Sequence, residues 1–545
     1  MIRYIRHASN IPDKQVDQAN QHRQGLDMTE FAGRISRRTF GAGLAGMAAL
    51  TAAGGGRPAQ AATEAIVIAT IGEPGPLDPT IVTSDLVSII TQHVFETLYT
   101  FDGGWQVRPL LADGMPQVSL DAKQYAIKLR AGVHFHDGSA MTADDAVASL
   151  QRWLALSPRG KQVAPYVEQI SADGALGLII KLHSPYAPLL ALLSMNNGAA
   201  VVIPKAMTQS ANALTNYVGT GPYRFADYKP DQYIRLTRFD AYTSPAGKPD
   251  GYAGERHAYI EELRFVPVPN PSTRVDGILS GEYQFADSLP AEMLARLRGK
   301  PAVAPITVKP FGFPLMIFNS KAGPLANPVL RQAAQAALSC GDMLAAAFGD
   351  PSFFAVEGSI YAKGTPFYDE SSVTAYNLND TALAGRLLKQ AGYAKQPIRI
   401  MTSQQYDFLY KMSLVAQQNL QDAGFEVDLQ VLDWATLLQR RGDEKAWDAF
   451  FTYHTFVPEP SLITILNPAY PGWWDTTEKH AMLDTFNGET DPGRRIDDWK
   501  KLQKLFFQQA PAIKVGEFYN LAARSARVAG YTTTPWPFFW NVRLG

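Results

Sequence analysis

Leu110 to Trp153 reads LLADGMPQVSLDAKQYAIKLRAGVHFHDGSAMTADDAVASLQRW, and it predicts a strand, a tight turn and a helix in succession. Residues 125–130 alternate large apolar side chains with small or charged ones, which is the period of a half-buried strand. Asp137-Gly138 supplies a turn, and Thr142 followed by Asp145 forms a capping box ahead of an apolar helical pattern. The stretch therefore predicts one α/β unit, without indicating a function.

Helices and strands also alternate in the second half of the chain. Asn379 stands where it can cap a helix that carries Leu383 and Leu387. A second helix is predicted over residues 410–423, and residues 425–431 follow it directly as an alternating strand. A helix followed at once by a strand favours α/β layering, so the predicted fold class is mixed α/β.

Length, charge and cysteine count limit the possible functions. The 545 residues exceed what one hydrophobic core ordinarily holds, so two or three domains are expected. Residues 62–545 carry a net charge of −5, which does not indicate the excess of basic residues expected of a protein that binds nucleic acid. Cys340 is the single cysteine, which excludes an intramolecular disulfide and cysteine-rich zinc sites.

The N-terminal region predicts export. Arg37-Arg38 lie in the string SRRTF, ahead of a Gly/Ala-rich apolar stretch and the small-x-small sequence Ala59-Gln60-Ala61. The apolar stretch is shorter than the roughly 20 residues needed to cross a bilayer as a helix. We therefore expect a cleaved twin-arginine signal over residues 1–61, with Met28 as an alternative start. The mature periplasmic chain would begin near Ala62.

No motif for catalysis or cofactor binding emerges from the mature sequence, so neither a cofactor nor a metal is expected. The residues 41–46 match GxGxxG, but no strand precedes them and they fall within the predicted signal. His134 and His136 stand two residues apart beside Asp137, as a metal pair could, yet a structural role in the turn is the stronger interpretation. An exported cofactor-dependent enzyme remains an alternative function.

Several strings along the mature chain resemble landmarks of the extracellular solute-binding proteins of family 5. These receptors deliver peptides, nickel chelates, sugars and related solutes to ABC importers. The stretch 110–153 is the most characteristic string, and the others occur in the family's order. They are LDPT at Leu77–Thr80, FETLYTFD at Phe95–Asp102, VGTGPYRF at Val218–Phe225, NSKAGPLANPVLRQAAQAAL at Asn319–Leu338, LNDTALAGRLLKQAGY at Leu378–Tyr393, AQQNLQDAGFEVDLQVLDW at Ala416–Trp434 and FYNLAARSARVAGY at Phe518–Tyr531.

This resemblance implies a two-lobed periplasmic binding protein of the type II fold (cluster C, with an enlarged lobe I). Lobe I is expected at 62–312, with an extra subdomain at about 105–215, and lobe II at 313–515, before residues 516–545 return to lobe I. The implied protein is a non-enzymatic, monomeric receptor. It would close on a small solute by a hinge motion and deliver it to inner-membrane ABC permease subunits. A receptor of the same fold that presents its ligand to a sensor is a further alternative.

Candidate ligand-binding residues come from loops and from aromatic side chains. Thr83 and Ser84 follow LDPT at the spacing where peptide-binding relatives offer a loop to the ligand backbone. Aromatic walls suit planar or sugar-like solutes, although most tryptophans of a large chain belong to its core. The candidates of this second kind are Trp434, Tyr453, His454, Phe456, Trp473 and Trp474.

Two charged anchors of peptide receptors are not found at the matching positions. The resemblance places an Asp for the peptide ammonium within Tyr453–Pro460, but Phe456 stands there, three residues from Glu459. Some dipeptide binders hold the ligand carboxylate with an Arg near Met401–Tyr406, where this chain has Gln404-Gln405. Because a buried unpaired charge is costly, free di- and tripeptides are expected to bind weakly. A larger, blocked, conjugated or glycosidic solute is the expected ligand.

Overall fold

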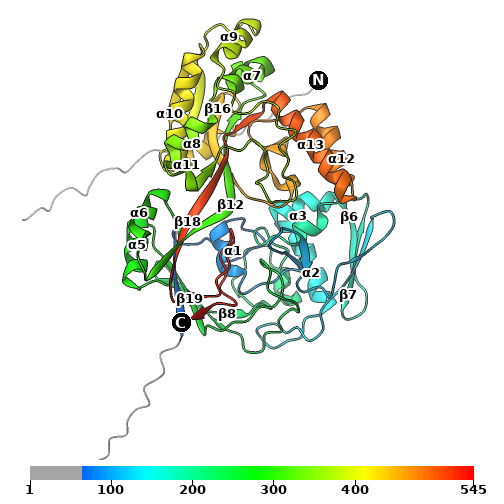
Figure 1. Cartoon of the computed structure of the whole chain (residues 1–545). Helices are drawn as coiled ribbons and strands as arrows, with labels where there is room; N and C mark the ends of the chain where they lie inside the picture. Colours follow the sequence, from blue (N-terminus) through cyan, green and yellow to red (C-terminus); the bar gives the residue numbers. More distant parts are fainter. Residues whose placement is uncertain (1–63) are drawn as a thin grey trace, which may run out of the picture. The chain divides into compact units, whose positions relative to one another are not determined.

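The computed structural model describes residues 64–545, so the twin-arginine string and its cleavage site lie outside the described residues. The described part is mixed α/β (Figure 1). None of its helices has the length and apolar character needed to cross a membrane. The helices are α1 (Asp85–Thr91), α2 (Ala143–Leu156), α3 (Pro158–Val163), α4 (Leu189–Leu193), α5 (Pro271–Ser280), α6 (Leu294–Leu297), α7 (Pro328–Ala337), α8 (Cys340–Phe348), α9 (Thr381–Gln390), α10 (Asp407–Asp422), α11 (Trp434–Arg440), α12 (Thr477–Gly488) and α13 (Pro492–Gln509).

One large sheet runs through the described residues, and three small sheets accompany it. In spatial order the large sheet consists of β15 (Val427–Val431), β14 (Ile398–Thr402), β16 (Ala449–Thr455), β12 (Val303–Phe318), β18 (Glu517–Ser525), β11 (Phe285–Leu289), β1 (Ala65–Thr70), β10 (Glu262–Pro267), β9 (Tyr233–Arg238) and β8 (Tyr223–Lys229). Two short strands join it at the side, β13 (Phe354–Ala355) on β18 and β17 (Ala512–Lys514) on β12. The small sheets are β4 (Gln117–Val118), β5 (Gln124–Lys128), β7 (Gly177–Leu182) and β6 (Val167–Ala172); β2 (Tyr99–Phe101) and β3 (Val107–Pro109); and β19 (Val528–Ala529) and β20 (Arg543–Leu544).

The long strand β12 and its neighbour β18 connect the two ends of the large sheet. Residues 303–308 of β12 pair with β18, whereas residues 312–318 pair with β16. The register of β12 against β18 shifts between Val308 and Gly312, so the two halves of β12 belong to different ends of the sheet. Figure 1 shows β12 and β18 passing side by side between these ends. The chain thus passes twice between two lobes.

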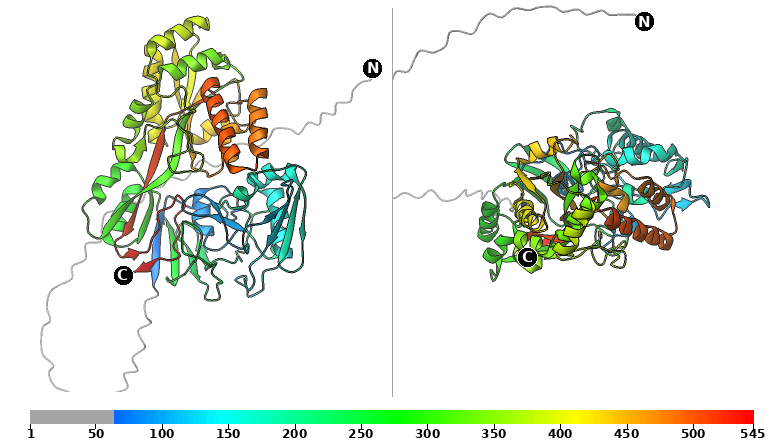
Figure 2. Two further views of the ribbon diagram at one scale, coloured as in Figure 1. Left: turned by 45° about the vertical axis from the view of Figure 1, so that its right-hand side comes forward. Right: turned by 90° about the horizontal axis from the view of Figure 1, so that it is seen from above.

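Helices α7, α8, α9 and α10 pack at the end of the sheet that carries β14, β15 and β16, and Figure 2 shows them gathered there in green and yellow. Their buried cluster includes Met316, Leu344 and Met412. The predicted helix over 410–423 is α10, which begins three residues earlier, and the strand after it is β15. The predicted cap of α9 is wrong by one residue, because Asp380, rather than Asn379, accepts the N–H of Leu383 (2.8 Å).

Residues 110–153 form the strand and the helix that were predicted for them. They lie at the end of the molecule opposite to helices α7 to α10 (Figure 1). The strand is β5, in the four-stranded sheet, and the helix is α2. The Thr142 and Asp145 capping box is present, with the N–H of Thr142 donating to the Asp145 carboxylate (2.9 Å). Helix α2 then buries Trp153, whose indole N–H donates to the Gly198 carbonyl (2.7 Å).

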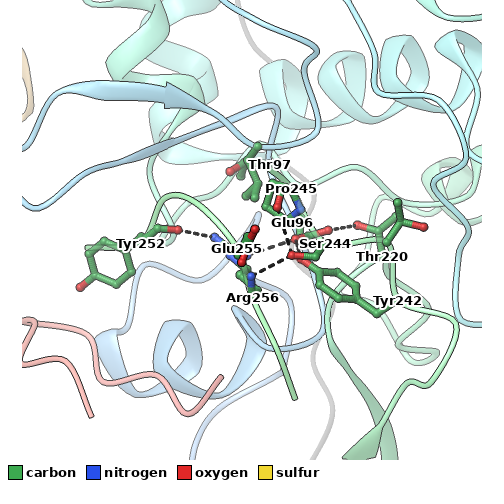
Figure 3. Close-up of polar contacts among 12 residues, drawn as sticks. Glu96, Thr97, Thr220, Tyr242, Ser244, Pro245, Tyr252, Glu255 and Arg256 are labelled. Atoms are coloured by element: carbon green, nitrogen blue, oxygen red, sulfur yellow. Dashed lines mark hydrogen bonds and ion pairs between the residues drawn. The ribbon is translucent and has the colours of Figure 1, made fainter. Parts of the chain in front are cut away.

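A buried polar network joins two of the sequence landmarks (Figure 3). Glu96 of FETLYTFD accepts hydrogen bonds from Thr220 of VGTGPYRF (2.9 Å) and from Tyr242 (2.7 Å). The same carboxylate forms an ion pair with Arg256 (3.1 Å), whose guanidinium lies over the Trp540 ring at 4.3 Å. Since both charges are paired and bonded, this network fixes the loops of 93–102, 218–222 and 242–256 to one another.

A second buried pair and a histidine stabilise the same region. Arg152 of α2 donates to Asp78 of LDPT (2.6 Å), with both side chains almost fully buried. Both ring nitrogens of His136 are bonded to backbone, Nδ1 accepting from Gly219 (3.2 Å) and Nε2 donating to Gly221 (2.9 Å). His136 therefore ties the hallmark turn to the turn after residue 218. Its neighbour His134 lies near the surface, and residues 64–545 contain no cluster of three or more His, Cys, Asp or Glu fit to hold a metal ion.

Candidate ligand-binding cleft

A cleft of about 520 Å³ opens where the two lobes meet the strands β12 and β18. Helix α1, strand β11 and the short helix at Ala291–Met293 form one side of it. Strand β16, the end of α8 and the beginning of α10 form the other side. This volume lies within the range of pockets that enclose small molecules. The cleft is therefore the candidate ligand-binding site.

Aromatic side chains form one wall of the cleft. Tyr453 on β16 lies at ring-centroid distances of 5.4 Å from Tyr406 and 5.6 Å from Phe408. Phe408 also stacks on Phe518 of β18 (5.3 Å), which in turn stacks on Phe348 of α8 (5.7 Å). Because these rings support one another, they form a continuous apolar surface on which a ligand can stack.

Carboxylates lie on the opposite wall. Asp287, in the middle of β11, is only 6% exposed, and its carboxylate accepts a hydrogen bond from the hydroxyl of Ser288 (3.1 Å). Asp85, at the start of α1, accepts from the indole N–H of Trp536 (2.7 Å) and from the amide of Asn197 (3.1 Å). Burial raises the pKa of both carboxyl groups, and the charge of Asp85 raises the pKa of Asp287 further. Burial therefore disfavours the charged form of both carboxyl groups, and a positive charge brought close to this wall would favour it.

The backbone at the carboxylate wall adopts an unusual conformation. Ser288 has a φ of 50°, in the left-handed region that costs a residue with a Cβ about 1 kcal/mol or more. It lies at the register shift of β11 against β18, between Ala286 and Leu289. Arg274 of α5 donates to the Ser288 carbonyl (2.9 Å), and Asn520 donates to its hydroxyl (3.4 Å). These bonds hold the bulge that places Asp287 and Ser288 along the cleft.

Two of the residues singled out in the sequence lie at the aromatic wall. Tyr453 lines the cleft. Trp434 is half-buried behind the lining and packs on Tyr406 at 4.7 Å. Its backbone N–H donates to the side chain of Gln405 (2.6 Å), which itself lines the cleft. Trp434 therefore supports the lining residues from behind.

Thr83 and Ser84 are exposed and immediately precede Asp85, which lines the cleft. Ser84 is the N-cap of α1, although its side chain makes no capping hydrogen bond. The loop that these two residues occupy thus ends at the carboxylate wall. The sequence-based prediction named Ser84 but not the next residue, Asp85, which lines the cleft.

The other candidate residues lie away from the lining, and all of them except the half-buried Trp473 are buried. His454 stacks on Phe313 at 5.4 Å and accepts the N–H of Thr464, and burial lowers its pKa. Phe456 is buried against Trp105 at 4.6 Å. Trp473 stacks on Trp447 at 5.6 Å, and the buried indole of Trp474 donates to Gln509 (2.6 Å). These contacts are those of core residues.

The acid that could have replaced the missing ammonium anchor is already paired. Glu459 is 2% exposed and receives two hydrogen bonds from the guanidinium of Arg495 (2.6 and 2.9 Å). It also caps the turn at Pro460–Leu462. Glu459 is consequently occupied in the protein interior and does not line the cleft.

Asp287 and the rings of Tyr406, Phe408 and Phe518 were missed by the sequence reasoning. A signal existed for Asp287, because the string FADSL places a charged residue within an otherwise strand-like apolar run. A signal also existed for Phe518, which opens the landmark FYNLAARSARVAGY. Nothing in the sequence indicated that these distant segments would face each other across one cleft.

Comparison with known proteins extends the resemblance over almost the whole chain. A protein of Sinorhizobium fredii named "Probable peptide ABC transporter periplasmic-binding protein" is 25% identical over 93% of this chain and 99% of its own length. The structure of DppA from Helicobacter pylori in complex with the peptide STSA matches with a TM-score of 0.74 and 22% identity, covering 88% of this chain and 98% of that one. NikA from Brucella suis in complex with Fe(III)-EDTA matches with a TM-score of 0.75 and 19% identity, covering 88% and 100%.

These two solved structures hold chemically unrelated ligands, so the shared fold does not by itself define the solute. They do establish the two-lobed architecture of a periplasmic binding protein for this chain. The model of the bacterial extracellular solute-binding proteins, family 5 (Middle), matches residues 106–472, which is more than half of the sequence. The chain belongs to the bacterial extracellular solute-binding proteins of family 5.

Proposed function

We propose that this protein is the periplasmic, monomeric receptor of an ABC importer and that it binds its solute without catalysing a reaction. The observation that supports this most directly is the cleft of about 520 Å³, which is lined by residues of both lobes and of the strands between them. The name of the Sinorhizobium fredii relative points to the same role in import. A solute that touches both walls stabilises the closed form, and the permease recognises that form.

The proposed hinge lies where the chain passes between the lobes, at residues 309–312 and 516–518. This proposal keeps the lobe boundaries expected from the sequence, 62–312 with 516–545 and 313–515. Contacts away from the hinge would then form on closure. Candidates are the N–H of Ala187 donating to the Asn487 carbonyl (2.8 Å) and the packing of Trp105 on Phe456. Few such contacts are needed if the solute supplies the rest.

The proposed solute is peptide-like in size but has no free carboxylate group, as in a blocked, conjugated or glycosidic compound. Phe456 and Gln405 occupy the positions expected for the charged anchors of peptide receptors. Phe456 is buried, Gln405 is neutral, and Glu459 is paired with Arg495. A simple dipeptide would therefore leave its carboxylate without a basic partner.

One purification tests the receptor function together with its export. The full chain, expressed with its own N-terminus, is isolated from the periplasm and analysed by mass spectrometry under native and denaturing conditions. We expect a chain that begins near Ala62 and a small solute that is released on unfolding. The variant with Arg37→Lys and Arg38→Lys is the matched control, because the twin-arginine pathway reads that pair. Its recovery from the periplasm at wild-type levels, or wild-type protein that never carries a solute, would contradict the proposal.

A further inference from the structure

The two walls of the cleft differ in charge. Among its lining residues four are acidic, Asp85, Asp287, Glu292 and Asp407, and none is Lys, Arg or His. Asp407 is exposed and pairs with Lys411 (2.5 Å), and Glu292 is exposed at the rim. The other two acids lie deeper, on the wall opposite Tyr406, Phe408 and Tyr453. A ligand in this cleft therefore meets negative charge on one side and aromatic rings on the other.

Asp287 is buried without an opposite charge to neutralise it. Within residues 64–545 Asp287 takes part in no ion pair, and its hydrogen bond comes from the adjacent Ser288. Arg274 of α5 is the nearest source of positive charge, but its guanidinium donates to the carbonyls of Val268 (2.6 Å), Pro269 (3.0 Å) and Ser288. The remaining titratable neighbours, Asp85 of α1 and Tyr531, add no positive charge.

Asp85 is in a similar position. Its two hydrogen-bond donors, Trp536 and Asn197, are neutral. The positive charge of Arg159 stabilises the Asp85 carboxylate from a distance. The Arg159 guanidinium itself is bonded to the carbonyl (2.7 Å) and the side-chain oxygen of Asn197. Both deep carboxylates thus face the cleft with part of their charge uncompensated, and such burial costs free energy unless a partner arrives.

We infer that the cleft selects an organic cation, with an ammonium or guanidinium group against Asp85 and Asp287 and an aromatic or apolar body against Tyr406, Phe408 and Tyr453. The inference rests on the proposed receptor function and names its solute class. The cation replaces the missing charge on one wall, and aromatic faces attract both rings and cations on the other. A carboxylate on the solute would meet four acids and no base, so anions are rejected and zwitterions disfavoured.

A panel of amines with matched neutral analogues tests this. The probes are 2-phenylethylamine, tryptamine, Phe-Phe amide and Phe-Ala-Phe amide, the N-acetyl form of each, and the free-acid forms of the two peptides. Dissociation constants are measured by calorimetry on protein freed of its bound solute. We expect at least one amine to bind at least about 30-fold more tightly than its acetylated form, as for a buried charge pair. The free-acid peptides should bind more weakly than their amides.

Variants assign the preference to the deep acids. Asp287→Asn should remove most of the preference for the amine, whereas Glu168→Gln, which takes the same charge from the exposed strand β6 outside the cleft lining, should change affinity less than about threefold because solvent and salt screen it. Equal binding of amine and acetylated forms, a preference that survives Asp287→Asn, or no binding by any amine would overturn the inference.

Failure of this inference and failure of the receptor function give different results. If the receptor function fails, protein from the periplasm carries no solute at all. If only the charge assignment fails, a solute is carried, but it is neutral or anionic and Asp287→Asn retains it to the same degree as the wild type.

Discussion

At the scale of single residues, the chemistry of the cleft depends on the carboxylates of Asp85 and Asp287, which have hydrogen-bond donors but no ion-pair partner. Asp287 loses hydration in the folded protein and gains a hydroxyl bond and the distant attraction of Arg274. Burial is the larger effect, so the pKa of Asp287 is raised above its ordinary value. A residue kept at such a cost is more readily explained by ligand binding than by stability.

This gives a prediction for the unliganded protein. Because the folded state holds the Asp287 proton more tightly than the unfolded state does, the free energy of unfolding should fall as the pH rises above the ordinary carboxyl pKa of 3.8. Asp287→Asn should reduce that dependence and stabilise the unliganded protein at neutral pH by on the order of 1 kcal/mol. Thermal unfolding measured from pH 4 to pH 8 checks this. A variant that is less stable than the wild type at neutral pH would assign Asp287 a structural role instead.

The aromatic candidates show what single residues in the sequence could and could not reveal. Tyr453 and Thr455 line the cleft, whereas His454 between them points to the opposite face of β16 and stacks on Phe313. The period of two along a strand could have separated these neighbours. No local sequence pattern shows whether Trp473 and Trp474 belong to the core or to a ligand site. The same aromatic residue types occur in both places, and only tertiary packing distinguishes the two cases.

At the scale of elements, the predictable parts were those with strong local signals. The alternation in β5 and the capping box of α2 both follow from their own residues. The length of β12 does not, because its two halves pair with different strands, β18 and β16. Pairing across about 130 to 220 residues of sequence is a property of the whole fold, so the strand that links the lobes could not be read from its own pattern.

Gly312 provides a test of that strand. A Cβ at this position would lie 2.5 Å from the carbonyl oxygen of His454 and 3.0 Å from the ring of Phe518, so the strands must shift to admit it. Gly312→Ala should therefore lower the free energy of unfolding by about 1–3 kcal/mol. Gly385→Ala in α9 is the matched control, because its Cβ would meet open space and alanine favours a helix by about 1 kcal/mol. Denaturant unfolding that ranks the two variants equally would contradict this account of β12.

At the scale of the whole molecule, the two-lobed fold was predicted from the order of the sequence landmarks. The structure shows that residues of different landmarks contact one another in the folded protein. Glu96, Thr220 and Arg256 come from three segments and meet in one buried network, and Asp78 meets Arg152 in another. Both networks stabilise the lobe that carries Asp85. The identity of the solute could not be predicted in this way, because it depends on which side chains two lobes bring to a shared cleft.

The central claim is that a solute held between the lobes closes them. Small-angle X-ray scattering on the wild-type protein, recorded after removal of the bound solute and again after the purified solute is returned, tests it most directly. We predict a smaller radius of gyration with the solute, and no change for the Asp85→Asn and Asp287→Asn double variant at the same concentration. Scattering profiles of the wild type that are identical with and without saturating solute would contradict the account.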